Sequence, residues 1–361
     1  MVGDFTIFYL FLMPILFLLN VAMLKKYSQM TYKMISMQQE IANAAEKAER
    51  WMLKHLKEES ILNRSLSDPV RYYKWPLALV QRGKYEEAGN IIEWINRHCL
   101  TGEGDYQSSR TGFHDTFHHY ANLWITLAAN RLGNTQLVEK LLGFILQFHS
   151  KETGGLATIP ANADQVTEDP VTTAFLGWAA CETGNRPLAD SAISYFERLL
   201  KQNAGNKRFW LRLDAEGALI QTVPEDADPK TYVIHLGEAE QCYYFLGAAC
   251  YFFARYMETF DDTPLTLAKQ YAGLLEKAGE KALNTIWAAK VAPGCVALYS
   301  VTGDEQFLNI APPVIEAVLE GQHPEGYWMK NGKPWITLTP EQCYWLSDMS
   351  GRLKSTSNHS N

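Results

Sequence analysis

A group of histidines with an aspartate lies just before an apolar segment that begins near residue 120. His114, Asp115, His118 and His119 place four titratable groups within six residues. Imidazoles and carboxylates exchange protons near neutral pH when a cavity shifts their pKa, which makes them common general acids and bases. Helix capping does not account for four such groups together. We therefore predict Asp115, His118 and His119 as catalytic residues.

The same group of residues also allows a metal site or a simple ion pair. His114 and His118 are four residues apart, a spacing that suits two zinc ligands on one helix face. A third ligand is missing from the pattern, so zinc at His114 and His118 is a minor alternative and we predict no cofactor. Asp115 and His119 have the same spacing and could pair with each other.

Two more carboxylates stand where later apolar segments begin. Asp169 precedes Pro170, and Glu240 opens the run Glu-Gln-Cys-Tyr, which recurs unchanged from Glu341. This recurrence predicts equivalent positions at two helix starts, and we add Asp169 and Glu240 to the catalytic set. The alternative is that Asp169 is an N-cap and Glu341 completes a capping box, because both residue types satisfy free N–H groups in a first helical turn.

Aromatic and polar residues close to these positions are candidates for binding a substrate. Aromatic faces stack on a sugar or stabilise a carbocation through their π-systems. The predicted substrate-binding residues are Tyr72, Tyr73, Tyr120, His235, Glu238, Tyr243, Trp328 and Tyr344. The alternative is that the aromatic members of this set belong to the hydrophobic core.

The elements that position these residues follow an internal repeat. Apolar segments beginning at Asp68, His118 and Asp169 each reach a glycine fifteen residues later, and these glycines lie 50 and 51 residues apart. An amphipathic segment follows each one, and the pattern continues along the chain, which predicts roughly twelve helices in six hairpins. Alternating residues over 207–223 predict one inserted β-hairpin. We expect an all-α fold apart from this hairpin.

The connections of this repeat alternate in length. Short turns such as Gly83-Lys84 and Gly133-Asn134 alternate with long connections such as 150–168 and 203–236. Long loops on a rigid scaffold are frequent sites of function, and here they gather the N-termini of the first helix of each pair, with their free N–H groups. The predicted pocket mouth therefore lies at the long-loop end.

Two stretches carry a resemblance to a known superfamily. Gly154-Gly155-Leu156, with the segment DPVTTAFLGWAACETGN from Asp169, resembles the repeat of α/α-toroid proteins such as terpenoid cyclases, protein prenyltransferase β-subunits and related (α/α)6 enzymes. The resemblance implies an (α/α)6 toroid catalytic domain over residues 36–353. The diagnostic aspartate-rich motifs of terpenoid cyclases are absent from the sequence, so the resemblance assigns no catalytic residue.

The two ends of the chain differ from this domain. Residues 5–24 (FTIFYLFLMPILFLLNVAML) form an uncharged apolar stretch long enough for a transmembrane helix. Three lysines follow it, so the positive-inside rule predicts a single-pass membrane protein with its C-terminal domain in the cytosol. We expect residues 1–35 to be a membrane anchor and linker, and the polar residues 354–361 to be a disordered tail.

The overall composition limits the possible partners. The net charge of −7 and the lack of a Lys/Arg stripe argue against a nucleic-acid partner, because such proteins neutralise phosphates with basic side chains. The six cysteines show no zinc-type spacing, and we expect them to be reduced.

Three functional hypotheses fit these features. The leading one is a membrane-anchored, terpenoid-cyclase-like enzyme that cyclises, isomerises or hydrates a small lipophilic, isoprenoid-like substrate in an aromatic-lined cavity. The second is a carbohydrate-active (α/α)6 enzyme, a glycosidase, lyase or epimerase, that uses paired carboxylates such as Asp169 and Glu240. The third is a non-catalytic toroid scaffold in which the carboxylates only cap helices.

Overall fold

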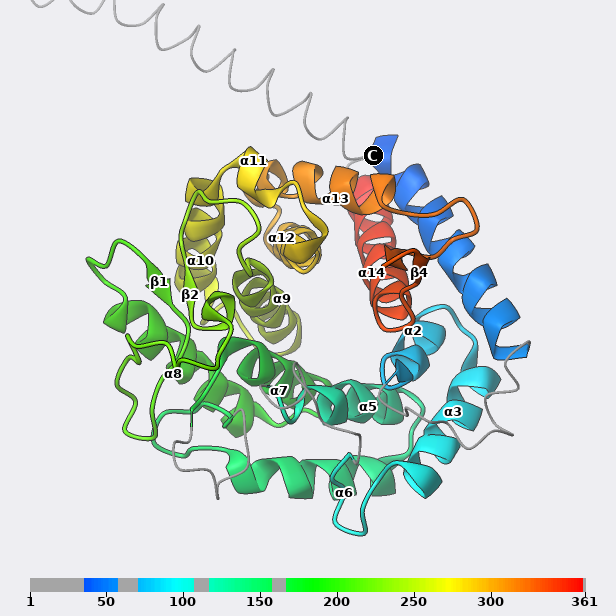
Figure 1. Cartoon of the computed structure of the whole chain (residues 1–361), viewed down its shortest axis with the longest axis horizontal. Coiled ribbons are helices and arrows are strands. Elements are labelled where there is room, and N and C mark those ends of the chain that lie inside the picture. Colours follow the sequence, from blue (N-terminus) through cyan, green and yellow to red (C-terminus); the bar gives the residue numbers. More distant parts are fainter. Residues whose placement is uncertain (1–35, 58–70, 107–116, 158–166, 360–361) are drawn as a thin grey trace, which may run out of the picture.

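The computed structural model describes residues 36–57, 71–106, 117–157 and 167–359. They form a ring of helices with an inner and an outer layer (Figure 1). The inner layer consists of α2 (Trp75–Gln81), α5 (Tyr120–Arg131), α7 (Pro170–Glu182), α9 (Tyr244–Thr259), α12 (Val291–Thr302) and α14 (Leu338–His359). The outer layer consists of the helix over residues 36–57, α3 (Tyr85–His98), α6 (Thr135–Ile145), α8 (Arg186–Gln202), α10 (Leu265–Ala278) and α13 (Pro312–Glu320). Shorter helices are η3 (Leu146–Phe148), η4 (Pro229–Thr231), α11 (Glu280–Leu283), η5 (Ile286–Ala288) and η6 (Phe307–Ile310).

The ring closes on itself. Each inner helix contacts the next, and α14 contacts α2, so the last inner helix lies beside the first. The first outer helix also contacts the segment after α13, where the Gln322 side chain donates a hydrogen bond of 2.8 Å to the Ala44 carbonyl. These contacts confirm the predicted helical toroid.

The inner and outer helices differ in which of their residues are buried. Every residue of α7 except Glu182 is buried, as expected for a helix that neighbours surround on all sides. In α3 and α8 the buried residues recur at helical spacing on one face, which is typical of helices that face solvent. The difference between the two layers therefore follows from hydrophobic periodicity.

Glycines set the short turns of the repeat. Gly83, Gly133, Gly184 and Gly303 have φ angles of 72°, 72°, 70° and 69°. A residue with a side chain is strained in this left-handed region, so glycine is favoured just past each helix end. After two of these turns, the side chains of Asn134 and Asn185 accept hydrogen bonds from backbone N–H groups and cap the next helix. The predicted repeat frame is confirmed at these positions.

The strands differ from the prediction in two respects. β1 (Phe209–Trp210) pairs antiparallel with β2 (Val233–Ile234), so its partner lies beyond the predicted hairpin over 207–223. Inside that range only an isolated bridge from Leu213 to Leu219 forms. A second hairpin, β3 (Met329–Lys330) with β4 (Lys333–Pro334), turns through the pair Asn331-Gly332, which have φ angles of 53° and 73°. Asn-Gly is a strong signal for such a two-residue turn, and it was missed.

The structure also corrects the predictions for the chain ends. Helix α14 continues to His359, so the described part of the predicted disordered tail is helical. The predicted membrane span over residues 5–24 lies outside the described residues. Among those that are described, no helix is both long and apolar enough to cross a membrane. The structure gives no support to the single-pass membrane localisation with a cytosolic domain, and we withdraw it.

Aromatic side chains fill the centre of the ring. The ring of Trp345 lies 4.8 Å from Tyr251, 5.9 Å from Trp178 and 6.0 Å from Trp124, measured between centroids. These residues come from four different inner helices, and all of them are buried. They form a floor across the ring, which we call the aromatic floor. Any central pocket must therefore lie on one side of it.

Candidate active site

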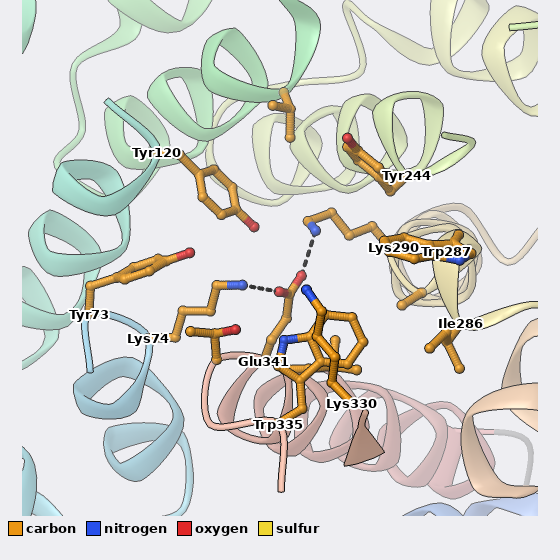
Figure 2. Close-up of a pocket in the computed structure, with 14 residues that line it drawn as sticks. Tyr73, Lys74, Tyr120, Tyr244, Ile286, Trp287, Lys290, Lys330, Trp335 and Glu341 are labelled. Atoms are coloured by element: carbon orange, nitrogen blue, oxygen red, sulfur yellow. Dashed lines mark hydrogen bonds and ion pairs between the residues drawn. The ribbon is translucent and has the colours of Figure 1, made fainter. Parts of the chain in front are cut away.

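A central pocket lies at the N-terminal end of the inner helices (Figure 2). It has a volume of about 340 Å³. Its lining residues are Tyr73, Lys74, Tyr120, Val171, Tyr244, Ile286, Trp287, Ala289, Lys290, Lys330, Trp335, Thr337, Leu338 and Glu341. The long connections of the repeat meet at this end, which agrees with the predicted position of the mouth.

All the inner helices contribute to the pocket from their first turn or the residue before it. The contributing residues, in chain order, are Lys74 before α2, Tyr120 in α5, Val171 in α7, Tyr244 in α9, Lys290 before α12 and Glu341 in α14. The closed ring brings these six positions together although they are distant in sequence. The pocket is thus a product of the repeat itself.

A buried ion-paired cluster of Lys74, Glu341 and Lys290 forms the base of the pocket (Figure 2). Glu341 Oε2 pairs with the Lys74 ammonium, and Glu341 Oε1 lies 2.5 Å from Lys290 Nζ. The three residues are only 4–8% exposed, so water screens these charges weakly. Trp345 in the aromatic floor donates from Nε1 to Glu341 Oε1 over 3.4 Å, which joins the cluster to the floor.

Burial and mutual charge shift the pKa values in this cluster. Burial disfavours the ionised form of Glu341, but the Lys290 and Lys74 ammoniums outweigh it and lower the pKa of this carboxyl to about 2. Burial lowers the pKa of Lys74 more than the Glu341 charge raises it, and Lys290 lowers it further. Glu341 is therefore ionised at neutral pH, and Lys74 releases its proton more readily than an exposed lysine.

Tyrosine rings form the walls around the two lysines. Lys74 Nζ lies 5.4 Å from the ring centroids of both Tyr73 and Tyr120. Lys290 Nζ lies 5.6 Å from the Tyr120 centroid and 5.1 Å from that of Tyr244. Burial raises the pKa of all three tyrosines well above the usual value, and for Tyr73 and Tyr120 the Glu341 charge adds to this. Their hydroxyls stay protonated and can donate hydrogen bonds to a ligand.

Two tryptophans and a third lysine stand at the rim of the pocket. The rings of Trp287 and Trp335 lie 6.1 Å apart at an angle of 69°, and Trp287 is 48% exposed. Lys330, at the end of β3, holds its ammonium 5.0 Å from the Trp335 ring centroid. Exposed aromatic faces beside polar groups are suited to stack on the apolar face of a sugar ring.

Most predicted site residues lie elsewhere. Of the predicted set, Tyr73 and Tyr120 line the pocket. His114 and Asp115 lie outside the described residues. His118 and His119 are buried against the outer layer, where the His119 ring centroid lies 4.5 Å from that of Phe148 and His118 Nε2 lies 3.3 Å from Asp105.

Asp169 serves as the N-cap of α7. Its Oδ1 accepts hydrogen bonds from the N–H groups of Val171 (2.7 Å) and Thr172 (3.0 Å), and Oδ2 lies 3.9 Å from Arg212 Nη1. Burial raises the pKa of Asp169, although Arg212 and these hydrogen bonds oppose it. This geometry matches the capping alternative, and Asp169 does not line the pocket.

The two Glu-Gln-Cys-Tyr runs are not equivalent. Helix α9 begins at Tyr244, after its run, whereas α14 begins at Leu338, before its run. Glu240 therefore lies in the preceding loop, with its side chain 75% exposed and 3.6 Å from Lys230 Nζ, while Glu341 projects into the pocket. The proposed pairing of Asp169 with Glu240 across a cavity is thus absent from the pocket.

The other predicted binding residues have structural contacts. Tyr243 donates from its hydroxyl to the Glu238 carbonyl over 2.9 Å and so fixes the loop that contains His235. Trp328 donates from Nε1 to the Val318 carbonyl over 2.8 Å. Tyr72 packs on Trp75, with 5.5 Å between centroids, and Tyr344 packs beside the aromatic floor, 4.8 Å from Trp345.

Sequence reasoning missed the residues that give the pocket its charge. Lys74 and Lys290 are single charges inside the apolar runs YYKWPLALV and IWAAKVAPGCVAL. A lone lysine in a segment that becomes buried is unusual, because an unpaired buried charge is strongly unfavourable. A single lysine inside an otherwise apolar run was therefore the sequence feature that could have identified these two residues. Among the described residues no group of three or more metal-ligating side chains is present, and the zinc alternative depends on His114, which lies outside them.

Comparison with known proteins supports the fold. The chain matches no protein-family model and no curated protein sequence. It resembles a family 76 α-mannanase from Bacteroides thetaiotaomicron (TM-score 0.58, 14% identity, 88% of this chain and 99% of that one). It also resembles an unsaturated glucuronyl hydrolase specific for heparin (TM-score 0.58, 12% identity, 89% and 98%) and a family 76 glycoside hydrolase from a bovine strain of the same bacterium (0.52, 15%, 80% and 68%). At these identities the likeness establishes the toroid fold.

The comparison overturns the leading functional hypothesis. The solved structures that resemble this chain include family 76 glycoside hydrolases and an unsaturated glucuronyl hydrolase, which points away from a terpenoid cyclase or prenyltransferase. The pocket agrees, because three ammonium groups line it and an isoprenoid-like substrate has no charge to match them. The prediction of a terpenoid-cyclase-like enzyme with a small lipophilic substrate is therefore wrong, whereas the toroid part of the resemblance is confirmed.

Proposed function

We propose that this chain is a carbohydrate-active toroid enzyme that binds a saccharide in the central pocket and acts on it by acid–base chemistry without a cofactor. The observation that carries the proposal is the buried Lys74–Glu341–Lys290 cluster beneath a rim of tryptophans. The fold of the neighbouring glycoside hydrolases is consistent with it. Aromatic stacking and convergent hydrogen-bond donors are what a sugar ring requires.

The charges in the pocket favour a lyase or an epimerase over a two-carboxylate glycosidase. Hydrolysis of that type needs one protonated and one ionised carboxyl group on either side of the glycosidic bond. Glu341 is the sole carboxylate among the described residues that line the pocket, and its pKa of about 2 makes it a poor acid. The proton carriers are instead Lys74 and Tyr120.

We assign a separate role to each of these groups. Lys74 in its neutral form removes a proton from a sugar carbon next to a carbonyl or carboxyl group. In an elimination the bond from the neighbouring carbon to the leaving oxygen breaks, and the Tyr120 hydroxyl donates its proton to that oxygen. Glu341 acts as a positioning residue that fixes both lysines, since it pairs with each of them.

Turnover of a saccharide panel by the purified full-length chain tests the proposal. Mass spectrometry of products made in water labelled on its oxygen distinguishes the reaction types. Hydrolysis incorporates an oxygen from water, and elimination does not. We expect unlabelled products, with loss of activity in Lys74→Met. Lys269→Met serves as the matched control, since Lys269 is half-exposed on the outer helix α10 and should keep full activity. A folded chain that neither binds nor converts any saccharide would contradict the proposal.

A further inference from the structure

We infer that the saccharide carries an anionic substituent, a carboxylate or a sulfate, which binds among Lys74, Lys290 and Lys330. This inference rests on the proposed function and names its substrate class. It is carried by the charge balance of the pocket, by the helix positions of two of the lysines and by the hydrogen-bond donors that remain unused.

The charge balance of the pocket is positive. Among the described lining residues there are three amino groups, on Lys74, Lys290 and Lys330, and one carboxylate, on Glu341. This leaves two positive charges when Lys74 is protonated and one when Lys74 is in the neutral form assigned to it as the base. The chain as a whole has a net charge of −7, so the excess is local. Lys330 is exposed, whereas Lys74 and Lys290 are buried and share the single charge of Glu341, so the ionised cluster keeps one uncompensated positive charge. A neutral sugar would leave this excess unchanged.

Two of the lysines lie at helix N-termini, where a lysine is unfavourable for the stability of the helix. Lys74 and Lys290 occupy the N-cap positions of α2 and α12, and neither supplies a side-chain cap. Asn, Asp and Ser are preferred there, and Asp169 shows the usual solution at α7 with two capping hydrogen bonds. A cation at a helix N-terminus is also repelled by the helix dipole. Helix capping therefore does not account for lysine at either position, and the Glu341 ion pairs account for only one of their two charges.

Hydrogen-bond donors on these lysines remain available. An ammonium group carries three N–H donors. Glu341 is the hydrogen-bond acceptor that the structure shows for Lys74 and for Lys290, so each retains donors towards the tyrosine-lined pocket. Lys330 contacts the Trp335 ring, and in Figure 2 it lies on the side of the pocket opposite Tyr120. A bound anion can thus accept hydrogen bonds from ammonium groups on two sides.

The size and the walls of the pocket indicate an anionic sugar rather than an inorganic ion. A volume of about 340 Å³ falls in the range of small-molecule sites. Trp287 and Trp335 provide apolar faces at the rim, for which a free sulfate or phosphate has no use. An anionic substituent on a sugar ring uses both the lysines and the tryptophans.

The inference predicts that the charge of Glu341 weakens binding of the anionic saccharide. Its carboxylate competes with a ligand anion for the same two ammonium groups. Replacement by glutamine removes that charge and keeps a similar shape. Glu341→Gln should therefore bind the anionic saccharide more tightly than the wild type, even though it loses turnover. A residue with only a structural role would not produce this opposite effect on binding.

Calorimetric titration of the full-length chain provides the experiment. The ligands are an oligosaccharide of hexuronic acids, the same oligosaccharide with its carboxyl groups reduced to alcohols, and a sulfated oligosaccharide with its desulfated counterpart. We expect an anionic form to bind about tenfold tighter than its neutral partner, with the preference falling at high salt. Lys290→Met should abolish the preference, and Lys269→Met should leave it intact.

The outcomes separate this inference from the proposed function. A preference for the carboxylated or for the sulfated ligand supports the inference and identifies the group. Equal binding of the charged and neutral partners overturns the inference and leaves the proposed function standing. Absence of binding by all four ligands to the wild-type chain overturns both. The wild-type comparison needs no variant, so its result does not depend on whether any variant folds.

Discussion

The two ends of the ring arrange charged side chains in different ways. At the short-turn end, Arg131, Arg255 and Arg352 face Glu182, Glu258 and Asp348, so three positive charges meet three negative ones. At the long-loop end, three lysines of the pocket face the single described carboxylate Glu341. The first network is balanced and the second is not. Equal numbers of opposite charges indicate a structural role, whereas an excess of positive charge beside a cavity indicates that a ligand binds there.

The helix dipoles reinforce this contrast. Arg131 is the last residue of α5 and Arg255 lies in the last turns of α9, where the negative ends of the helices favour a cation. Lys74 and Lys290 precede α2 and α12, where the positive ends disfavour one. Arginine also suits a structural network because its planar group can bind two acceptors at once, as Arg131 does with Glu182 and Tyr344.

Glu341→Gln should produce the largest functional effect. It removes the group that positions both pocket lysines, and we expect kcat/KM to fall by at least about 100-fold, the range typical of lost acid–base positioning. The variant should also lose stability, on the order of 3 kcal/mol, because two ammonium groups lose their partner. Steady-state kinetics and urea unfolding measure the two effects. Near-normal turnover in a folded Glu341→Gln would refute the assigned role.

Glu182→Gln is the matching change at the short-turn end. Glu182 accepts hydrogen bonds from Arg131 and Trp178, the latter over 2.8 Å, and lies 3.7 Å from Arg255. Loss of its charge should lower the free energy of unfolding by about 3 kcal/mol, as for other broken buried pairs. Saccharide affinity should stay within about twofold of the wild type, since the aromatic floor separates the two ends. If Glu182→Gln lost saccharide affinity but kept the wild-type free energy of unfolding, the contrast between a structural end and a binding end of the ring would be wrong.

Glu168 extends the comparison to a buried carboxyl group that has no paired cation among the described residues. It is 2% exposed, and Thr153 Oγ1 donates to its Oε1 over 2.6 Å. Burial raises its pKa from 4.5 to about 7. Because the folded pKa exceeds the unfolded one, the stability it contributes is complete below about pH 4.5 and is lost as the pH rises through about 7.

Glu168→Gln should therefore remove a pH dependence rather than add one. We expect the variant to be more stable than the wild type at pH 8, by on the order of 2 kcal/mol, and similar at pH 5. Glu341 acts with the opposite sign: its lowered pKa stabilises the fold above about pH 4.5, and this contribution disappears as the pH falls towards 2. Urea unfolding across this pH range measures both slopes. Parallel curves for the wild type and Glu168→Gln would contradict the Glu168 assignment.

The fold could be predicted because its signals are local. The glycine frame, with Gly133 and Gly184 in left-handed turns, and the contrast between all-round apolar and amphipathic segments are visible in a single stretch of sequence. The pairing of β1 with β2 could not be predicted in the same way, because more than twenty residues separate Trp210 from Val233.

The site was harder to predict because it depends on where each helix begins. Glu240 and Glu341 open identical runs, yet one lies before α9 and the other inside the first turn of α14. A difference of a few residues in the helix start therefore moves one carboxylate to solvent and the other into the pocket. The cluster at 114–119 was also misleading, since its described histidines His118 and His119 pack against the outer layer.

Trp287→Ala should have the smallest effect and tests the rim alone. Trp287 is 48% exposed and packs against Trp335 without a role in the ion-paired cluster, so stability should change by less than about 0.5 kcal/mol. Loss of one stacking face should weaken saccharide binding by about threefold to tenfold, equally for charged and neutral ligands. Calorimetric titration with the charged and neutral pair measures this. If affinity falls only for the charged ligand, the rim and the lysines act together, and the separation between a stacking rim and a charged base is wrong.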